Sequence, residues 1–443
     1  MSSTLERRTP DFKYDPYWWD ADVIASDSAS SQPPLPKKAD VLIVGGGVTG
    51  VEAGRALAAA GRDVLILDAA EPGRGASSRN AGQIGRNFKH SFVELQQTLG
   101  LEVAKRYFRE LRAAYDAAAE LGAVAGAQIG WRKCGRIVAA LTPTLFDKVR
   151  LEYELRAEHV GEEIEVVGPS DIGGELGSPL YYGAVRILEN GAIQPALYYR
   201  YLHNRAAQAG AKIVGYTTVT GIYRSAKDFI VETTRGQVVA REVLVATNGY
   251  STAALPWFKR RLAPIDAFMI ATEPLSPELI KQVVPRLRTY HDNRRRAHYI
   301  SLSPDGTRVL FGGRTGGLPS SRASIVDALQ EDLRFFFPVL RDTRISHGWT
   351  GRCAGTRDLF AHVGMHDGIH YALGYCFSGM AMGPYLARKA AARILGQTEA
   401  AQTIFESPTF RALPLPALGP WLIPVLTHYW AWADRPPGLA RSI

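Results

Sequence analysis

One glycine-rich segment constrains the fold of this chain more than any other part of it. An apolar run at residues 39–44 stops at Gly45, Gly47 and Gly50, which are spaced G-x-G-x-x-G. An alanine-rich stretch follows, and a second apolar run ends at Asp68. This order predicts a strand, a tight turn, a helix and a second strand within about thirty residues, which is the context that a dinucleotide-binding fingerprint requires.

The residue types of this segment suit the phosphates and the ribose of a dinucleotide. Gly45 permits the tight turn, Gly47 lets the backbone approach a pyrophosphate, and Gly50 lets helix and strand pack closely. Thr49 lies in the first helical turn, whose free N–H groups and positive dipole end attract phosphates. Asp68 would accept hydrogen bonds from a ribose diol, and its charge would repel a 2′-phosphate. The segment therefore predicts bound FAD or NAD rather than NADP.

Length and composition place the chain among ordinary globular proteins. At 443 residues it is long for one core, so we expect two connected domains. The first 38 residues lack the apolar segment of a secretory signal, and the apolar run at 421–432 is too short to span a bilayer. Cys134, Cys353 and Cys376 lie far apart, which predicts no disulfide framework and no metal cluster. We therefore expect a cytoplasmic protein without a metal site.

The net charge of +9 includes basic clusters at residues 259–261 and 294–296. Such clusters could steer an anionic substrate or contact nucleic acid or membrane. A solvated surface is the simpler interpretation, because no RNA-binding motif accompanies them, and we expect no nucleic-acid partner. The Pro- and Trp-rich C-terminus would suit either peripheral membrane contact or a buried core. The sequence does not indicate an oligomeric state.

The pattern of apolar residues divides the chain into interleaved segments. Strand-like runs, such as residues 229–233, alternate with helical stretches, such as residues 323–336. We expect these segments to form an N-terminal arm at 1–38, a discontinuous dinucleotide-binding domain at 39–125, 191–260 and 346–400, a substrate domain at 126–190 and 261–345, and a C-terminal extension at 401–443.

Four blocks of sequence match the pattern of a known family. They are residues 40–68, residues 75–83 with the sequence G-A-S-S-R-N-A-G-Q, residues 303–314, and residues 349–388. On these motifs the chain resembles the D-amino-acid-oxidase-like (DAO) family of FAD-dependent oxidoreductases, and within it the gamma-glutamylputrescine oxidoreductase type of amine oxidase. The resemblance implies an α/β (α+β) fold in which a Rossmann-like FAD-binding domain is interleaved with a mixed-sheet substrate domain, as in DAO and glutathione-reductase-type flavoproteins. It also implies FAD as the cofactor, held without a covalent bond.

The block at residues 75–83 suits a loop that runs beside the isoalloxazine ring of FAD. Ser77 and Ser78 are small and hydrogen-bonding, so they could touch the pyrophosphate. Asn80 and Gln83 could reach heteroatoms of the ring, and Gly82 would admit the ring edge without a clash.

Further FAD contacts are expected at three other places. The apolar run that ends near Thr247 would return the chain to the adenosine side of the cofactor. A helix that begins near Ser378 would direct its N-terminal dipole at the pyrimidine end of the flavin and stabilise the charge that appears there on reduction. The further cofactor-binding residues that we expect are Val219, Thr247, Gly249, Gly374, Ser378, Gly379 and Met380.

Two departures from the family's pattern bear on the reaction. The G-H-G that the family carries before its last helix is matched by Phe377-Ser378-Gly379, which could alter reactivity towards oxygen. The arginine that holds the α-carboxylate in glycine- and D-amino-acid-oxidising members is matched by Cys353. Its neighbour Arg352 would point to the opposite face of the strand. The resemblance therefore implies a substrate without an α-carboxylate in that place.

The candidate catalytic residues are Tyr299, Arg314, His347 and Arg352. Tyr299 and Arg314, together with Arg86, could hold a distant anionic group of the substrate. His347 could assist deprotonation of the amine or line the cavity, although structural packing is the simpler interpretation. For each of the others a structural or surface role is likewise the alternative.

The expected function is oxidation of the C–N bond of a small amine, such as a polyamine derivative or another alkylamine. Hydride would pass to flavin N5, the imine would be hydrolysed, and the electrons would pass to oxygen or to an electron carrier. The substrate amine must be neutral when hydride leaves, and a desolvating site favours that form.

Three alternatives remain open. The first is a dehydrogenase or oxidase of an N-substituted or D-amino acid, of sarcosine or glycine type, that passes electrons to a quinone or carrier. The second is action on a tRNA-linked aminomethyl group, for which the basic surface is the only support. The third is a non-catalytic protein that retains FAD structurally.

Overall fold

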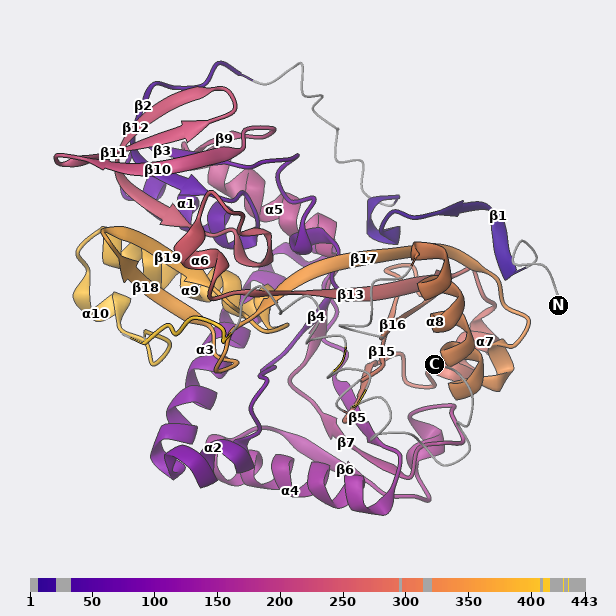
Figure 1. The fold of residues 1–443 in the computed structure, drawn as a ribbon. Coiled ribbons are helices and arrows are strands. Elements are labelled where there is room, and N and C mark those ends of the chain that lie inside the picture. Colours follow the sequence, from indigo (N-terminus) through magenta and orange to yellow (C-terminus); the bar gives the residue numbers. More distant parts are fainter. Residues whose placement is uncertain are drawn as a thin grey trace.

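The computed structural model describes residues 7–20, 33–294, 297–313, 321–406 and 409–414, together with Val425 and Tyr429 (Figure 1). Its two large sheets lie side by side, and the chain passes between them several times. The third sheet is small and consists of β4 (Gln83–Ile84) and β8 (Gly191–Ala192).

The first large sheet has eight strands in the order β10-β11-β12-β2-β3-β9, and β19 joins it beside β12 and pairs with β18. Because β2 runs parallel to both β3 and β12, their carboxyl ends meet at one edge, which is where open α/β sheets bind ligands. The strands are β2 (Lys38–Val44), β3 (Val64–Leu67), β9 (Lys212–Val214), β10 (Val219–Ser225), β11 (Asp228–Thr233), β12 (Gly236–Val245), β18 (His362–His366) and β19 (Ile369–Leu373).

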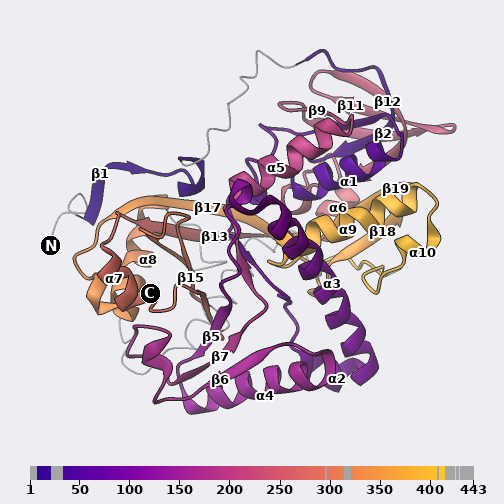
Figure 2. The ribbon, with the colours of Figure 1, turned by 180° about the vertical axis from the view of Figure 1, so that it is seen from behind.

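Helices α1 (Val48–Ala59), α5 (Pro195–Gln208) and α9 (Gly379–Ile394) pack on one face of this sheet (Figure 2). Their contact with it is a core of small and branched residues that includes Val41, Ile43 and Ile66. The neighbouring helices are α2 (Phe92–Leu99), α3 (Leu101–Ala125), α6 (Pro256–Lys259) and α10 (Thr398–Ala401).

The second large sheet has nine strands in the order β1-β17-β13-β16-β15-β14-β5-β7-β6. Helices α4 (Pro143–Val160), α7 (Pro277–Val283) and α8 (Arg322–Phe336) belong to this half of the molecule. The strands are β1 (Arg8–Lys13), β5 (Arg136–Ala140), β6 (Ile164–Val167), β7 (Gly183–Ile187), β13 (Ala263–Thr272), β14 (Thr289–Asp292), β15 (Tyr299–Leu302), β16 (Val309–Gly313) and β17 (Ile345–Gly355).

The two faces of the nine-stranded sheet have different coverings. On one face Ile270 and Phe311 pack against Leu329 and Phe336 of α8 in an apolar core. The opposite face carries Trp349, Met269, Tyr299 and His291, and we call it the inner face. The N-terminal arm and the loop at residues 73–84 lie on the inner face, since Trp18, Ala81 and Trp349 share one cluster.

Most elements lie where the local pattern predicts them. The helix expected from residue 381 to 395 spans Gly379–Ile394, and the strand expected at 229–233 spans Asp228–Thr233. The structure adds a pairing that the sequence did not predict, because β1 of the arm runs parallel to β17. Within the described residues, no helix has both the length and the apolar character required to cross a membrane. The apolar run at 421–432 lies almost wholly outside those residues, so the expectation of membrane contact there stays a prediction.

Candidate FAD site and the adjoining sheet face

The turn between β2 and α1 is fixed by backbone contacts that leave no room for side chains. Gly45 has φ +108°, and a Cβ there would lie 2.8 Å from the carbonyl oxygen of Ala246. A Cβ at Gly50 would lie 1.9 Å from the carbonyl oxygen of Gly45. The lack of a side chain at Gly45 therefore leaves space for the end of β12, and the lack of one at Gly50 leaves space for the backbone of the turn. Thr247 follows directly, with its backbone nitrogen 3.2 Å from the position of a Cβ at Gly45.

The N-terminus of α1 offers hydrogen-bond donors to a ligand. Gly47 caps the helix without a side-chain hydrogen bond, and the first turn contains no acidic residue. The hydroxyl of Ser77 accepts from the backbone N–H of Val48 at 3.0 Å, so its own proton is available to a second acceptor. A Cβ at Gly47 would lie 2.8 Å from that hydroxyl and would fill the cradle. Bare N–H groups, a hydroxyl and a helix dipole are the donor set that suits a pyrophosphate.

Asp68 lies half-buried beside this turn, without a cationic partner among the described residues. Its two oxygens accept from the backbone N–H groups of Gly46 at 2.8 Å and Ala70 at 3.0 Å. Burial raises the pKa of this carboxyl, and the two backbone hydrogen bonds oppose that rise. Each oxygen can accept another bond, so a pair of ribose hydroxyls fits it. The backbone of Thr217 donates to the carbonyl of Asp68, which brings Val219, at the start of β10, to the same edge.

Three tryptophan indoles hold the loop that contains η4 (Ala76–Ser78). Two come from the N-terminal arm and one from β17, and each donates its ring N–H to a successive residue of the loop. The bonds are Trp19 to the Ser78 hydroxyl at 3.0 Å, Trp349 to the Arg79 carbonyl at 3.0 Å, and Trp18 to the Asn80 carbonyl at 2.8 Å. The hydroxyl of Ser78 in turn donates to the carbonyl of Gly73 at 2.7 Å.

The amide side chains of this loop make protein contacts. Asn80 accepts from the backbone of Gly82 at 2.9 Å and donates to the carbonyl of Ser77 at 3.0 Å, with Met380 Sδ also 3.0 Å away. Gln83 donates to the carbonyl of Ile300 at 2.9 Å. These bonds connect the loop to α9 and to β15, and direct contact of Asn80 or Gln83 with the flavin stays a prediction.

The backbone before α9 is strained. Cys376 and Phe377 have φ +46° and +79°, conformations that cost non-glycine residues about 1 kcal/mol or more each. Gly374, at φ +78°, donates its N–H to the side chain of Asn248 at 2.9 Å. Ser378 donates its hydroxyl to the carbonyl of Asn87 at 2.7 Å. The first turn of α9 has no side-chain cap and no acidic residue, so its N–H groups are available to an acceptor.

The remaining predicted FAD residues connect these parts. Thr49 shares a hydrogen bond of 2.9 Å with the hydroxyl of Tyr375, which joins α1 to the segment before α9. A Cβ at Gly249 would lie 2.4 Å from the carbonyl of Cys353, so the end of β17 meets η7 (Asn248–Tyr250). Gly379 begins α9 without a close contact.

The inner face presents one row of side chains across five strands. The pairing runs from Trp349 to Met269, then to Gly312, Tyr299 and His291. Gly312 has no side chain, and a Cβ there would lie 1.9 Å from the Tyr299 ring, so this ring lies across β16. Residues that pair directly lie on the same face, so the row is continuous from β17 to β14.

The structure describes three of the four candidate catalytic residues and does not bring these three together. Tyr299 lies in the row and donates to the carbonyl of Phe268 at 3.3 Å. His347 is bonded to Asp20 at 2.9 Å and to the hydroxyl of Ser346 at 3.0 Å. The other candidates are accounted for in different ways: Arg352 forms a two-point contact with Asp266 at 2.8 and 3.0 Å, Arg86 is buried against Glu189, and Arg314 lies outside the described residues.

Two residues at this face were missed by the sequence reasoning. His291 lies opposite Tyr299, and Lys89 lies with its ammonium 5.2 Å from the centre of the Phe377 ring. The signals that could have indicated them are weak: His291 belongs to a short strand-like run, and Lys89 closely follows the loop at 75–83.

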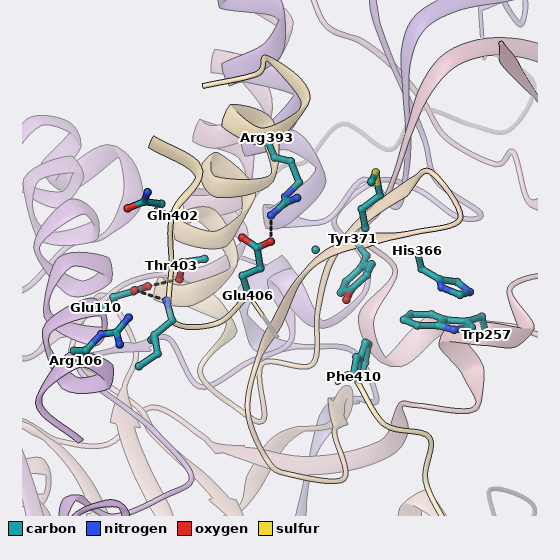
Figure 3. Close-up of a pocket in the computed structure, with 13 residues that line it drawn as sticks. Arg106, Glu110, Trp257, His366, Tyr371, Arg393, Gln402, Thr403, Glu406 and Phe410 are labelled. Carbon is teal, nitrogen blue, oxygen red and sulfur yellow. Dashed lines mark hydrogen bonds and ion pairs between the residues drawn. The ribbon is translucent and has the colours of Figure 1, made fainter. Parts of the chain in front are cut away.

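A cavity of about 830 Å³ lies elsewhere, between α3, the β18–β19 hairpin and the segment after α10 (Figure 3). None of the residues described above lines it. Its charged groups largely satisfy one another, because Arg393 pairs with Glu406 and Glu110 accepts from Thr403 and Ile404. Among the described residues, no group of three or more His, Cys, Asp or Glu side chains could hold a metal ion.

Parallel strands that end at a glycine turn, an open helix start and a half-buried carboxylate are the arrangement of a dinucleotide-binding fold. A family model described as FAD dependent oxidoreductase (DAO) matches residues 40–393, and the chain therefore belongs to that family. Its cofactor is accordingly FAD, and the protein is an FAD-dependent oxidoreductase.

Curated relatives and solved structures agree with this assignment. The chain is 28% identical over 375 residues to a probable oxidoreductase OrdL of Haemophilus influenzae, covering 83% of this chain and 86% of the relative. It is 27% identical over 366 residues to gamma-glutamylputrescine oxidoreductase of Escherichia coli, covering 81% and 84%. The crystal structure of glycine oxidase from Geobacillus kaustophilus matches with a TM-score of 0.69 at 22% identity, covering 85% of this chain and 99% of that one. The predicted fold class and family are thereby confirmed.

Proposed function

We propose that the protein oxidises the C–N bond of a small amine to an imine, which water then hydrolyses. The substrate class we favour is a polyamine derivative or another alkylamine. Support comes from the similarity to gamma-glutamylputrescine oxidoreductase, at 27% identity over most of both chains.

The observation that carries the proposal is the set of side chains that β17 presents to the inner face. The residues on that face are Trp349, Gly351 and Cys353, none of which is charged, because side chains alternate along a strand. The neighbouring Arg352 is on the other face and is held by Asp266. β17 therefore offers no cation for an α-carboxylate, and a substrate with a simple amine end suits this face better than an α-amino acid.

The protein's part in such a reaction is positioning. When bound, FAD would accept the hydride that the α-carbon of the amine releases. The glycine turn, Ser77 and Asp68 would hold the pyrophosphate and the ribose, and the loop at 75–83 would hold the ring next to the inner face. The open first turn of α9 would stabilise negative charge at the pyrimidine end. The segments around 39–125, 191–260 and 346–400 would act as the FAD-binding domain, and those at 126–190 and 261–345 as the substrate domain.

We further propose that FAD is held without a covalent bond. Cys353 lies on the inner face, and its thiol donates to the carbonyl of Ile265 at 3.4 Å. Burial raises the pKa of the Cys353 thiol well above its usual range, so the thiol stays protonated. A protonated thiol is a poor nucleophile and would not form a thioether with the flavin.

The test is anaerobic mixing of the FAD-loaded protein with a panel of polyamines, γ-glutamylated amines, sarcosine, glycine and D-amino acids. We expect the amines to bleach the flavin absorbance faster than the α-amino acids do. Bleaching by α-amino acids alone would favour the glycine-oxidase type of reaction instead. Subsequent mixing of the reduced protein with air or with a soluble quinone would identify the electron acceptor.

A further inference from the structure

His291 is a histidine of the inner face that the expected mechanism does not use. It lies on β14, directly opposite Tyr299 on β15, and its side chain is partly exposed. Neither ring nitrogen has a hydrogen-bond partner among the described residues. Tyr290, the preceding residue, faces the apolar core under α8, so His291 faces the other way.

The histidine of β17 and the histidine directly before β15 differ in that respect. His347 is bonded to Asp20 and Ser346, and His298 is bonded to Arg294 at 2.6 Å and to Asp332 at 3.2 Å. Both have their nitrogens occupied by the protein. A partly exposed imidazole without a partner, in a region where neighbouring histidines are all bonded, is a candidate for binding a ligand.

Burial, reinforced by nearby cations, keeps His291 neutral. Burial lowers the pKa of His291 to about 4, the adjacent Asp292 opposes this, and Arg136, Lys89 and Arg294 reinforce it. Asp292 pairs with Arg294. At neutral pH the imidazole therefore has one nitrogen that accepts and one N–H that donates.

His291 also lies next to the loop that we expect beside the flavin. Gln83 donates to the carbonyl of Tyr290 at 3.4 Å and to the carbonyl of Ile300 at 2.9 Å. Tyr290 and Ile300 pair with each other, and Tyr290 directly precedes His291 in β14 while Ile300 directly follows Tyr299 in β15. The loop thus contacts the backbone directly beside the His291–Tyr299 pair. Lys89 contacts the Phe377 ring just before α9.

We propose that His291 binds the nitrogen of the substrate amine, with the neutral imidazole accepting a hydrogen bond from its N–H. This inference rests on the proposed function and names a residue for it. Lys89 and Arg136 are cations that lower the pKa of His291, and the same positive charge disfavours a protonated amine next to the imidazole. The residue therefore selects the uncharged amine, whose proton is released to solvent on binding, and orients the nitrogen for loss of hydride from the adjacent carbon. His291 acts as an acceptor of a hydrogen bond rather than as a base.

The test compares His291→Leu, His291→Gln and the wild-type protein, all loaded with FAD, by anaerobic flavin reduction with the best amine of the panel. We expect His291→Leu to lower kcat/KM by about 10- to 100-fold, because the N–H of the bound amine would then lack its hydrogen-bond acceptor. His291→Gln, whose carbonyl oxygen can accept the same bond, should recover a large part of that loss. His370→Gln is the matched control, because burial also lowers the pKa of His370 to about 4 but this residue lies in the other sheet. We expect it to leave the rate unchanged.

A pH profile separates binding of the amine from a purely structural role. In the wild type, the rate should rise with pH as the bound amine loses its proton. Lys89→Gln should move that midpoint to higher pH, because it removes a cation that disfavours the ammonium. A midpoint that does not move would overturn the electrostatic part of the inference.

The outcomes distinguish this inference from the proposed function. If amines reduce the wild-type flavin and His291→Leu does so equally well, the inference is wrong and the proposed function stands. If no amine reduces FAD-loaded wild-type protein, the proposed function itself fails. If His291→Leu does not retain FAD, His291→Phe replaces it, since phenylalanine keeps a flat ring and removes the acceptor.

Discussion

The glycine turn and the inner face are built in opposite ways. The turn is made of backbone atoms from residues close together in sequence, between Gly45 and Asp68, with Ala246 as the distant contact. The inner face is made of residues from five strands that are spread from Met269 to Trp349 in the sequence. The sheet pairing brings them into one row that runs from Trp349 to His291.

Because of this difference, the two regions tolerate different amino-acid substitutions. At the turn, an added methyl group meets a carbonyl oxygen that cannot move, so spacing and residue type are both constrained. At the inner face, a changed side chain alters the chemistry and leaves the strands in place. The first region therefore reports the cofactor class, and under the proposed function the second would decide which substrate the protein accepts.

The largest expected effect comes from Gly50→Ala. The added Cβ would lie 1.9 Å from the carbonyl of Gly45, so the turn must open. We expect loss of bound FAD and a loss of about 4 kcal/mol in the free energy of unfolding, which is exceptional for one substitution. FAD absorbance after purification and denaturant unfolding measure it. Gly173→Ala is the control, since nothing lies within 4 Å of its Cβ. Equal FAD content in both variants would show that the turn is not under this constraint.

Asp68→Asn should weaken FAD binding by about 10- to 100-fold, because hydrogen bonds to a charged acceptor contribute more than those to a neutral one. Fluorescence titration of the apoprotein with FAD measures this.

The pH dependence of FAD binding has a definite sign. Burial raises the pKa of the Asp68 carboxyl in the ligand-free protein, so the protonated form is favoured there. The protonated Asp68 carboxyl therefore contributes to the stability of the ligand-free protein at pH values below the ordinary pKa of an aspartate. This contribution is lost as the pH rises through the raised pKa of Asp68. Ribose hydroxyls donate to the ionised form, so FAD affinity should increase over the same interval and level off above it. Asp68→Asn should show no such increase, and a parallel increase in both would point to another group.

Trp18→Phe tests the hydrogen bonds by which the indoles hold the loop at 75–83. It removes the bond to the Asn80 carbonyl, and we expect a loss of about 1 kcal/mol in the free energy of unfolding, which is about 1 °C in the melting temperature for a chain of this length. FAD should remain bound. Trp257→Phe is the control, because the indole of Trp257 has no hydrogen-bond partner among the described residues. Loss of FAD from Trp18→Phe would mean that the arm belongs to the cofactor site itself.

The smallest effect is expected from Cys353→Ala. Because the thiol is protonated and bonded only to a backbone carbonyl, its removal should change the rate of flavin reduction by less than about twofold. Acid precipitation should release all flavin from both the variant and the wild type. Yellow colour retained in the wild-type precipitate, and absent from that of the variant, would show a covalent bond.

Much of the fold followed from the sequence. The apolar runs and the helical spacing are local signals, so the strand at Asp228–Thr233 and the helix at Arg322–Phe336 were predicted within a few residues. The β1–β17 pairing was not predicted, because strands that pair over more than 330 residues leave no local pattern. The candidate site divides in the same manner, since the glycines and Asp68 lie together in sequence while His291 and Lys89 do not.

The sequence by itself determined the dinucleotide turn, the FAD family and the fold class, because each depends on contiguous residues whose spacing has one steric solution. Only the tertiary structure decided that three indoles hold the loop at 75–83, and that Arg352 and His347 are bonded within the protein. It alone also placed His291 on the inner face, without a hydrogen-bond partner among the described residues. Sheet register is the reason, since it alone determines which distant side chains share a face and which of them find a partner.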